Sequence, residues 1–329
     1  MVTHELKGFV RYAGEIIFCG CIIAILAAAT VLVSYDPEAY AASFRHKFDR
    51  LAQTPDPRLI IVGGSGVAMQ IDSGMLEAGT GLHPANMGVF AATGMRFMLA
   101  SIEDKLRPTD TVLIIPEHEV VQQPPYGSGY YLLQMIHADP LLLKYLATYH
   151  SATTVARHAP QWFQDRFDSI YARMIAPRLF GKSPPIDELY NIHNFNAYGD
   201  IISEAAGDRH LTQEELLASE GGRIGDSGMD PATAEVLRAS IPAFEARGAR
   251  VVFTLPVMAA SIFALEREAT EARMAELASV VGTGRIFGSF EDFILQDDLF
   301  LDASSHPTAA GRKEYTRRLI PLLKAHLNA

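Results

Sequence analysis

Cysteine is almost absent from this chain of 329 residues. Its only two cysteines, Cys19 and Cys21, lie close together in one apolar run near the N-terminus. A disulfide framework needs several separated cysteines, and structural zinc sites take their ligands from spaced Cys and His pairs. The sequence therefore excludes a disulfide-stabilised fold and a cysteine-based zinc site.

Positive charge is also scarce. The chain has 28 Lys and Arg residues against 38 Asp and Glu residues, which gives a formal net charge of −10 at pH 7. Nucleic-acid binding proteins obtain much of their affinity from basic residues on phosphates, so we expect no nucleic-acid partner. Hydrophobic residues make up 49% of the chain and charged residues 20%, a balance that excludes intrinsic disorder. The length allows one large globular domain or two smaller ones.

Charged residues are missing altogether from residues 16–34. This apolar run is about long enough to cross the ~30 Å hydrocarbon core of a bilayer as a helix. The apolar region of a cleaved signal peptide, the alternative, normally has about 7–15 residues. We therefore expect an uncleaved membrane anchor over residues 14–35.

The charges that flank this run predict its orientation. Two basic residues precede it and two acidic residues follow it: Lys7, Arg11, Asp36 and Glu38. The positive-inside rule then predicts a cytoplasmic tail over residues 1–13 and an exported C-terminal body. We expect a single-pass protein of the bacterial inner membrane with its C-terminal domain in the periplasm. A basic cluster at residues 45–50 favours the opposite orientation.

Short β-branched runs alternate with helical patterns in the remainder of the chain. Buried strands are predicted at residues 58–62, 111–115 and 250–255. Helices are expected at residues 91–106, from Pro231 to Gly248, at 262–280 and at 307–327. This alternation predicts an α/β fold, namely a three-layer, open and mostly parallel sheet with helices on both faces.

Two segments depart from the alternation. Residues 36–57 are polar and end in the breaker-rich sequence Thr54-Pro55-Asp56-Pro57, so we expect a partly helical stalk. Residues 121–229, approximately, combine an aromatic helical stretch with a segment rich in Gly, Asp and Glu. We expect an inserted helical region that covers the carboxyl edge of the sheet, where open α/β proteins bind ligands. The α/β domain itself then covers residues 58–329.

Ser65 follows the first predicted strand in the sequence Gly63-Gly64-Ser65-Gly66. A serine on a tight strand-to-helix turn presents its hydroxyl group as a nucleophile and its N–H to a developing oxyanion. The glycines permit an unusual backbone and close approach of a substrate. An ordinary turn, or a weak phosphate-binding loop without a lysine, is the alternative interpretation of this motif alone.

Asp302 and His306 lie in a second short segment, before a helix that Pro307 can start. A histidine can remove the proton of a serine hydroxyl, and a carboxylate can hold the tautomer of that histidine. The sequence therefore predicts that Asp302 and His306 pair within one loop. A helix-capping loop with an exposed histidine is the alternative.

The order of these segments resembles the SGNH (GDSL-like) hydrolases, and in particular their membrane-anchored branch of DltD-like and polysaccharide O-acyltransferase proteins. The resemblance covers residues 58–329, with a poorly defined middle. It rests on Ile60 to Ser65, on Pro84-Ala85-Asn86-Met87-Gly88-Val89, on Val112 to Glu119, on Asn194 to Asp200, and on Asp302 to Arg312. It implies an SGNH/flavodoxin-like sheet and a site that needs no cofactor and no metal.

The resemblance also implies roles for individual residues. Ser65, Asp302 and His306 are the expected catalytic residues. The expected oxyanion donors are Ser65, Asn86, Gly88, Ala91 and His118, and the expected substrate-binding residues are Glu117, His118, Asn194 and Asn196. Glu117, His118 and Glu119 could also form a metal pair, but the sequence has no HExxH helix or other zinc spacing beside them.

Four positions depart from the family pattern. Gly64 stands where an aspartate is usual. The segment Val112 to Glu119, which corresponds to the third sequence block of the family, lacks Gly-x-Asn-Asp, and this leaves His118 near the position of an oxyanion asparagine. Ala91 stands near a usual oxyanion glycine. Asp302 precedes His306 by four positions rather than three. These differences affect the expected oxyanion hole more than the expected triad.

We therefore expect a periplasmic serine esterase, deacylase or O-acyltransferase that acts on ester groups of an envelope or exopolysaccharide glycan, such as a cellulose-type polymer. Its expected partners are this acyl-ester or glycan substrate, the membrane through residues 14–35, and a membrane-bound acyltransferase or polysaccharide synthase. The alternative function is that of a catalytically silent SGNH-fold accessory subunit in a polysaccharide secretion or modification complex. The missing third-block asparagine favours this alternative.

Overall fold

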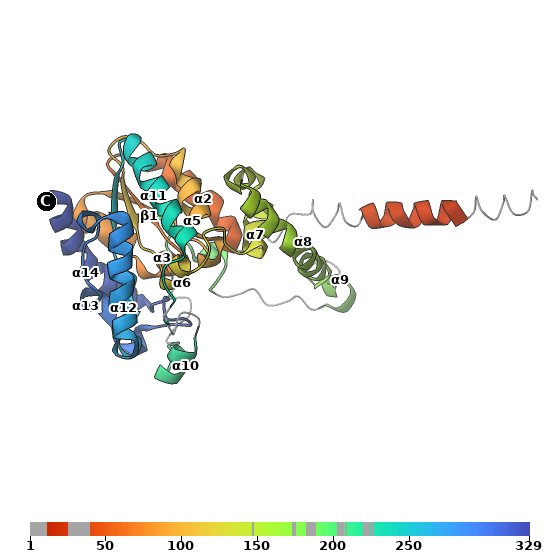
Figure 1. Cartoon of the computed structure of the whole chain (residues 1–329). Coiled ribbons are helices and arrows are strands. Elements are labelled where there is room, and N and C mark those ends of the chain that lie inside the picture. Colours follow the sequence, from red (N-terminus) through yellow and green to blue (C-terminus); the bar gives the residue numbers. More distant parts are fainter. Residues whose placement is uncertain are drawn as a thin grey trace, which may run out of the picture.

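A parallel sheet of four strands forms the centre of the computed structural model (Figure 1). The strands are β1 (Arg58–Val62), β2 (His83–Asn86), β3 (Thr111–Ile114) and β4 (Arg250–Phe253), and they lie in the order β2-β1-β3-β4. Ile61 of β1 pairs with Asn86 on one side and with Leu113 on the other. The predicted α/β class and its parallel sheet are therefore confirmed.

The structure describes residues 12–25, 40–146, 148–172, 176–181, 189–202, 207, 209–219, 225 and 227–329. The helices are α2 (Ser43–Gln53), α3 (Ser65–Gln70), α4 (Ser73–Thr80), α5 (Met95–Glu103), α6 (His118–Gln122), α7 (Gly129–Ala138), α8 (Tyr149–Ile170), α9 (Ala176–Phe180), α10 (Gln213–Ala218), α11 (Pro231–Ala246), α12 (Ala260–Val281), α13 (Phe290–Phe293) and α14 (Ala309–Asn328). A second, two-stranded sheet pairs β5 (Met258–Ala259) with β6 (Ile294–Leu295).

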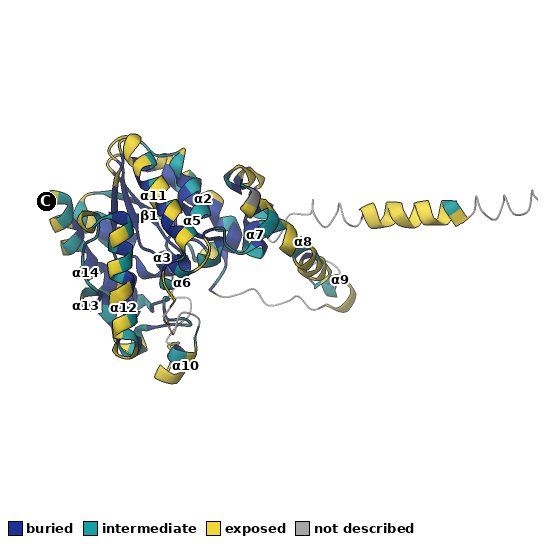
Figure 2. Cartoon of the chain, viewed as in Figure 1, coloured by how far each residue is buried: buried dark blue, intermediate teal, exposed yellow. Residues whose placement is uncertain are grey.

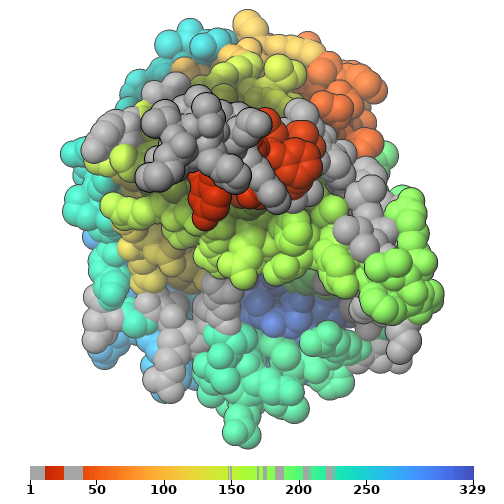
Figure 3. Space-filling view, turned by 90° about the vertical axis from the view of Figure 1, so that its right-hand side faces the viewer, coloured from red at the N-terminus to blue at the C-terminus, as the bar shows by residue number. Residues whose placement is uncertain are grey.

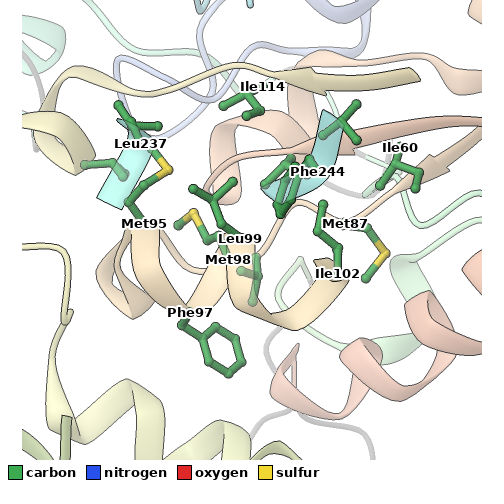
Figure 4. Close-up of a cluster of buried hydrophobic side chains, with 14 of the residues drawn as sticks. Ile60, Met87, Met95, Phe97, Met98, Leu99, Ile102, Ile114, Leu237 and Phe244 are labelled. Carbon is green, nitrogen blue, oxygen red and sulfur yellow. The ribbon is translucent and has the colours of Figure 1, made fainter. Parts of the chain in front are cut away.

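Alternate residues of the strands point to opposite faces of the sheet and build two separate cores. Ile60 and Ile114 pack with side chains of α2, α5 and α11, and Figure 4 shows Met95, Met98 and Leu99 of α5 lying toward them. Leu59 and Ile61 point the other way and pack with side chains of α3, α4 and α14. Helices therefore cover both faces, and the strands are buried except for their first residues His83 and Arg250 (Figure 2).

The helix before β4 begins and ends where its sequence predicts. Asp230 accepts hydrogen bonds from the N–H groups of Ala232 and Thr233, and Pro231 occupies the first turn. Gly248 follows the helix with φ of 86°, a conformation that glycine adopts without strain. The helix expected at residues 91–106 is instead divided, because Gly94 has φ of 81° between a 3-10 turn (Ala91–Thr93) and α5.

The expected stalk is not a separate segment in the described residues 40–57. Tyr40, Phe44 and Leu51 are buried, and Phe44 and Leu51 belong to the core beneath α5 and α11. The spacing of these two residues places both on one face of α2, which is why this helix packs on the domain. The α/β domain therefore begins by residue 40.

The predicted membrane anchor lies only partly within the described residues. Residues 12–25 are helical and almost wholly exposed (Figure 2), and residues 26–39 lie outside the described part. No helix in the described residues combines the length and apolarity that crossing a bilayer requires. The anchor over residues 14–35 stays a prediction.

The inserted region contains two unlike parts. α8 and α9 extend away from the sheet (Figure 1), whereas Leu132 and Met135 of α7 belong to the core of the domain. Residues 189–202 instead fold back onto the domain, where Leu189 and Ile201 pack with Ala68, Met69 and Leu301. Figure 3 shows the C-terminal part of the chain, in dark blue, between the inserted helices and α10. Only part of the insertion therefore approaches the carboxyl ends of the strands.

Candidate active site

Ser65 is the first residue of α3, directly after β1 and the Gly63-Gly64 turn. The polypeptide runs from β1 to the edge strand β2 and then crosses to β3 on the opposite side of β1. Such a switch in direction opens a crevice at the carboxyl ends of the two inner strands. Ser65 thus occupies the position where an open parallel sheet most readily binds a ligand.

His306 lies beside Ser65, although 241 positions separate them in the sequence. Its Nε2 is 2.9 Å from Ser65 Oγ, and its Nδ1 is 2.8 Å from Asp302 Oδ1. The Leu301 N–H donates to the carbonyl oxygen of His306, which closes the loop that presents Asp302 and His306. The structure therefore brings together the three residues that the two sequence motifs suggested.

The environment of Asp302 favours its ionised form. Burial opposes ionisation, but hydrogen bonds from His306 and Tyr190 and the attraction of a protonated His306 outweigh it and lower the pKa of Asp302. An ionised carboxylate at this position can keep the Nδ1 proton of His306 and leave Nε2 free to accept a proton.

Tyr190 is a member of this cluster that the sequence did not reveal. Its hydroxyl donates to Asp302 Oδ2 over 2.6 Å and lies 3.1 Å from His306 Nδ1. The residue belongs to the part of the insertion that folds back, and no motif or periodicity marks it. Tyr190 therefore holds the second carboxylate oxygen of Asp302, while His306 Nδ1 contacts the first.

A cavity of about 120 Å³ opens beside Ser65. Its lining includes Phe90, Ala91, Glu119, Tyr131 and His306. Among the described residues, the N–H groups of Ser65 and Ala91 have no hydrogen-bond acceptor. Both residues line the cavity, so their N–H groups are candidate backbone donors for an oxyanion there.

Asn86 and Gly88 do not supply the oxyanion donors expected of them. The Gly88 N–H donates to Asn86 Oδ1 over 2.9 Å. The Asn86 amide donates to the carbonyl oxygen of Val67 and to Asp200 Oδ1. Because both donors already have partners, the structure corrects this expectation, and Asn86 acts as a buried link between β2, α3 and Asp200.

His118 is also not placed beside Ser65. Its ring stacks on Phe290 with a centroid distance of 5.6 Å, and it borders a separate small cavity of about 30 Å³. Burial lowers the pKa of His118 to about 4, so the imidazole is neutral at pH 7. The expected role of His118 as an oxyanion donor is therefore not supported by its position.

Asn194 and Asn196 hold the backbone of their own loop. Asn194 donates to the carbonyl oxygen of Leu189, and Asn196 accepts from the N–H groups of Tyr198 and Asp200. Asn196 borders a different cavity of about 770 Å³, between α2 and residues 192–199. Neither asparagine lines the Ser65 cavity, and their expected substrate-binding role stays a prediction.

Glu117 lies under the Ser65 turn, and its carboxylate accepts hydrogen bonds from the backbone of that turn. It therefore does not face the Ser65 cavity as a substrate-binding residue would. In the part of the chain that the structure describes, no cluster of three or more His, Cys, Asp or Glu side chains could hold a metal ion.

No protein-family model matches the chain, and no curated protein matches it. The chemistry of the site therefore has to be inferred from the side chains that meet at Ser65.

Proposed function

We propose that this protein is an SGNH-type serine acyl hydrolase or O-acyltransferase with Ser65 as its nucleophile. The supporting observation is the hydrogen-bonded series from Ser65 Oγ through His306 to Asp302, with distances of 2.9 and 2.8 Å. A nucleophile, a base within hydrogen-bond distance and a group that orients the base define this class of site on unrelated folds.

Each residue of the series has a distinct role in the proposed reaction. Ser65 Oγ attacks the ester carbonyl carbon while His306 Nε2 takes the hydroxyl proton, and Asp302 stabilises the resulting imidazolium. The N–H groups of Ser65 and Ala91 bind the oxyanion. His306 then gives its proton to the departing alcohol, which leaves an acyl group on Ser65.

The second half of the reaction regenerates the serine. Water or a sugar hydroxyl attacks the acyl-enzyme, and His306 removes its proton. The new oxyanion collapses with return of the proton to Ser65 Oγ, and the acid or the acylated sugar is released. Hydrolysis and transfer thus differ only in the acceptor, and neither needs a metal or a cofactor.

The predicted anchor suggests where this chemistry takes place. A chain held in the bacterial inner membrane by residues 14–35, with its domain in the periplasm, would meet envelope and exopolysaccharide glycans, including cellulose-type polymers. A membrane-bound acyltransferase or a polysaccharide synthase would be the matching partner. The apolar run at residues 16–34 and its flanking charges support this part of the proposal.

Covalent labelling tests the proposed nucleophile directly. A fluorophosphonate reacts with a serine hydroxyl that an adjacent base activates, so the full-length protein should be labelled and Ser65→Ala should not. Ser73→Ala is the matched control, because its hydroxyl donates to Asp200 rather than to a histidine. Equal labelling of Ser65→Ala and the unsubstituted protein would eliminate Ser65 as the nucleophile.

A silent accessory subunit is the second candidate function. The third block lacks the usual asparagine, and the donors of Asn86 and Gly88 are occupied. This alternative predicts no labelling of Ser65 and no ester turnover by the folded protein. The same probe therefore separates the two candidates.

Tyr190→Phe should lower kcat for a nitrophenyl acetate about tenfold and leave KM nearly unchanged. The substitution removes one hydrogen bond to the ionised Asp302, and such bonds are worth about 1.5–3 kcal/mol. Tyr198→Phe is the matched control, since its hydroxyl donates to Glu77 on α4. Steady-state kinetics measures both variants, and equal kcat values would show that Tyr190 does not assist the pair.

A further inference from the structure

Glu117 is joined to the backbone on both sides of Ser65. Its Oε2 accepts the Gly64 N–H over 2.8 Å, and its Oε1 accepts the Gly66 N–H over 3.0 Å. Glu117 follows β3, whereas the turn follows β1. One carboxylate thus connects the ends of two neighbouring strands through the residues that flank the nucleophile.

The two glycines of this turn make room for the carboxylate. A Cβ atom at position 64 would lie 2.6 Å from Glu117 Oε1, and one at position 66 would lie 2.9 Å from the same oxygen. Both separations are shorter than van der Waals contact. The Gly-Ser-Gly sequence therefore fits a carboxylate that approaches the backbone closely. This close approach accounts for Gly64 at the position where the SGNH pattern has an aspartate.

Burial of the Glu117 carboxylate beneath the Ser65 turn disfavours its ionised form. Glu117 is only 3% exposed, and burial without a full set of partners disfavours the charged form. Burial raises the pKa of Glu117 to about 7, against the lowering effect of the Gly64 hydrogen bond. The titratable groups whose charges act on it are Glu119, His306, Tyr40 and Tyr315. A buried carboxyl group that bridges a nucleophile turn is expected where function needs a fixed geometry.

We propose that Glu117 is a positioning residue that holds the Ser65 turn, and with it Ser65 Oγ, within hydrogen-bond distance of His306 when its carboxylate is ionised. This inference rests on the proposed function for the role of Ser65. An ionised carboxylate accepts both N–H groups. A protonated carboxyl group presents an O–H on one oxygen, which cannot accept from an N–H in the same direction, so one of the two bonds is lost.

The decisive variant is Glu117→Gln in the full-length protein, because the amide has nearly the same size but cannot accept at both positions. Glu235→Gln, on the exposed side of α11, is the matched control. We expect Glu117→Gln to lower kcat and the rate of fluorophosphonate labelling by about 100-fold, the loss that a misplaced reacting group causes. KM should change little, because Glu117 does not face the Ser65 cavity.

The pH profile supplies a readout that a merely structural role would not move. Glu117 is ionised above about pH 7 and protonated below it. Labelling of the unsubstituted protein should therefore fall as the pH decreases through about 7, and Glu117→Gln should lose the part of this dependence that comes from Glu117. Glu235→Gln should keep the full profile.

Amide hydrogen exchange keeps this inference distinguishable from the proposed function. The peptide that contains residues 62–70 should exchange faster in Glu117→Gln than in Glu235→Gln, whether or not Ser65 reacts with the probe. If the unsubstituted protein does not react with the fluorophosphonate, the proposed function is overturned, but the positioning role of Glu117 is not. Equal exchange rates in Glu117→Gln and Glu235→Gln would overturn the positioning role. If the unsubstituted protein is labelled, equal labelling rates and kcat values in these two variants would also overturn it.

Discussion

His306→Ala is expected to lower kcat for an ester substrate by about 10⁴-fold or more while the protein remains folded. The imidazole is the only side chain within hydrogen-bond distance of Ser65 Oγ in the described part of the chain. Without it, the serine must lose its proton to water, and the departing alcohol has no general acid. Losses of about this size follow removal of the base from a serine triad.

Asp302→Asn separates the role of the carboxylate from that of the imidazole. The asparagine amide can present an N–H to His306 Nδ1, which favours the tautomer with its proton on Nε2 and blocks proton removal from Ser65. Steady-state kinetics should show a loss comparable to that of His306→Ala. His46→Ala, on the exposed side of α2, serves as the control and should keep full kcat. Retention of turnover in His306→Ala would contradict the assigned base.

The strands that the sequence revealed are those buried on both faces. After a polar first residue, β1, β3 and β4 are continuous apolar runs, because a parallel strand between two helical layers has no polar side. β2 was not predicted, since His83-Pro84-Ala85-Asn86 lacks such a run. It is an edge strand, and its proline is tolerated there because no further strand of the described residues pairs with its outer side.

The residues of the site that the sequence revealed are those next to a strand end or a helix start. Ser65 follows β1, and Asp302 and His306 precede α14, so local patterns locate all three. Tyr190 joins Asp302 across 112 positions only because residues 189–202 fold back onto the domain. The hydrophobic periodicity of a sequence does not predict that a segment such as residues 189–202 folds back onto the domain.

Side-chain direction was the least predictable property of the site. Asn86 and Gly88 lie in the expected block, but buried Asp200 accepts from Asn86 and also from Ser73 and Asn196. A carboxyl group buried inside a domain needs hydrogen-bond donors, and it therefore determines where their side chains point. Asn86 and Asn196, which resembled ligand-binding residues, instead donate to this carboxylate, whereas Asn194 donates to the carbonyl oxygen of Leu189.

Asp110→Ala should reduce the free energy of unfolding by about 3–5 kcal/mol, the typical loss when one partner of a buried ion pair is removed. Asp110 is fully buried and accepts from Arg58 Nε over 2.8 Å, and Arg58 is 1% exposed. The Arg58 guanidinium also donates to the carbonyl oxygens of Leu51 and Lys105. The pair thus links the end of α2 to the starts of β1 and β3, at the edge of the sheet opposite to Ser65.

Urea unfolding of the full-length protein measures this loss, with Asp104→Ala as the matched control. Asp104 pairs with Lys105 and Lys144 on the surface, where such contacts contribute about 0–1 kcal/mol. Because the buried pair lies at the amino edge of the sheet, folded Asp110→Ala should still react with a fluorophosphonate at the rate of the unsubstituted protein. Equal unfolding free energies for the two variants would mean that the carbonyl groups and Asp56, whose Oδ1 lies 3.8 Å from Arg58 Nε, compensate the buried Arg58 charge without Asp110.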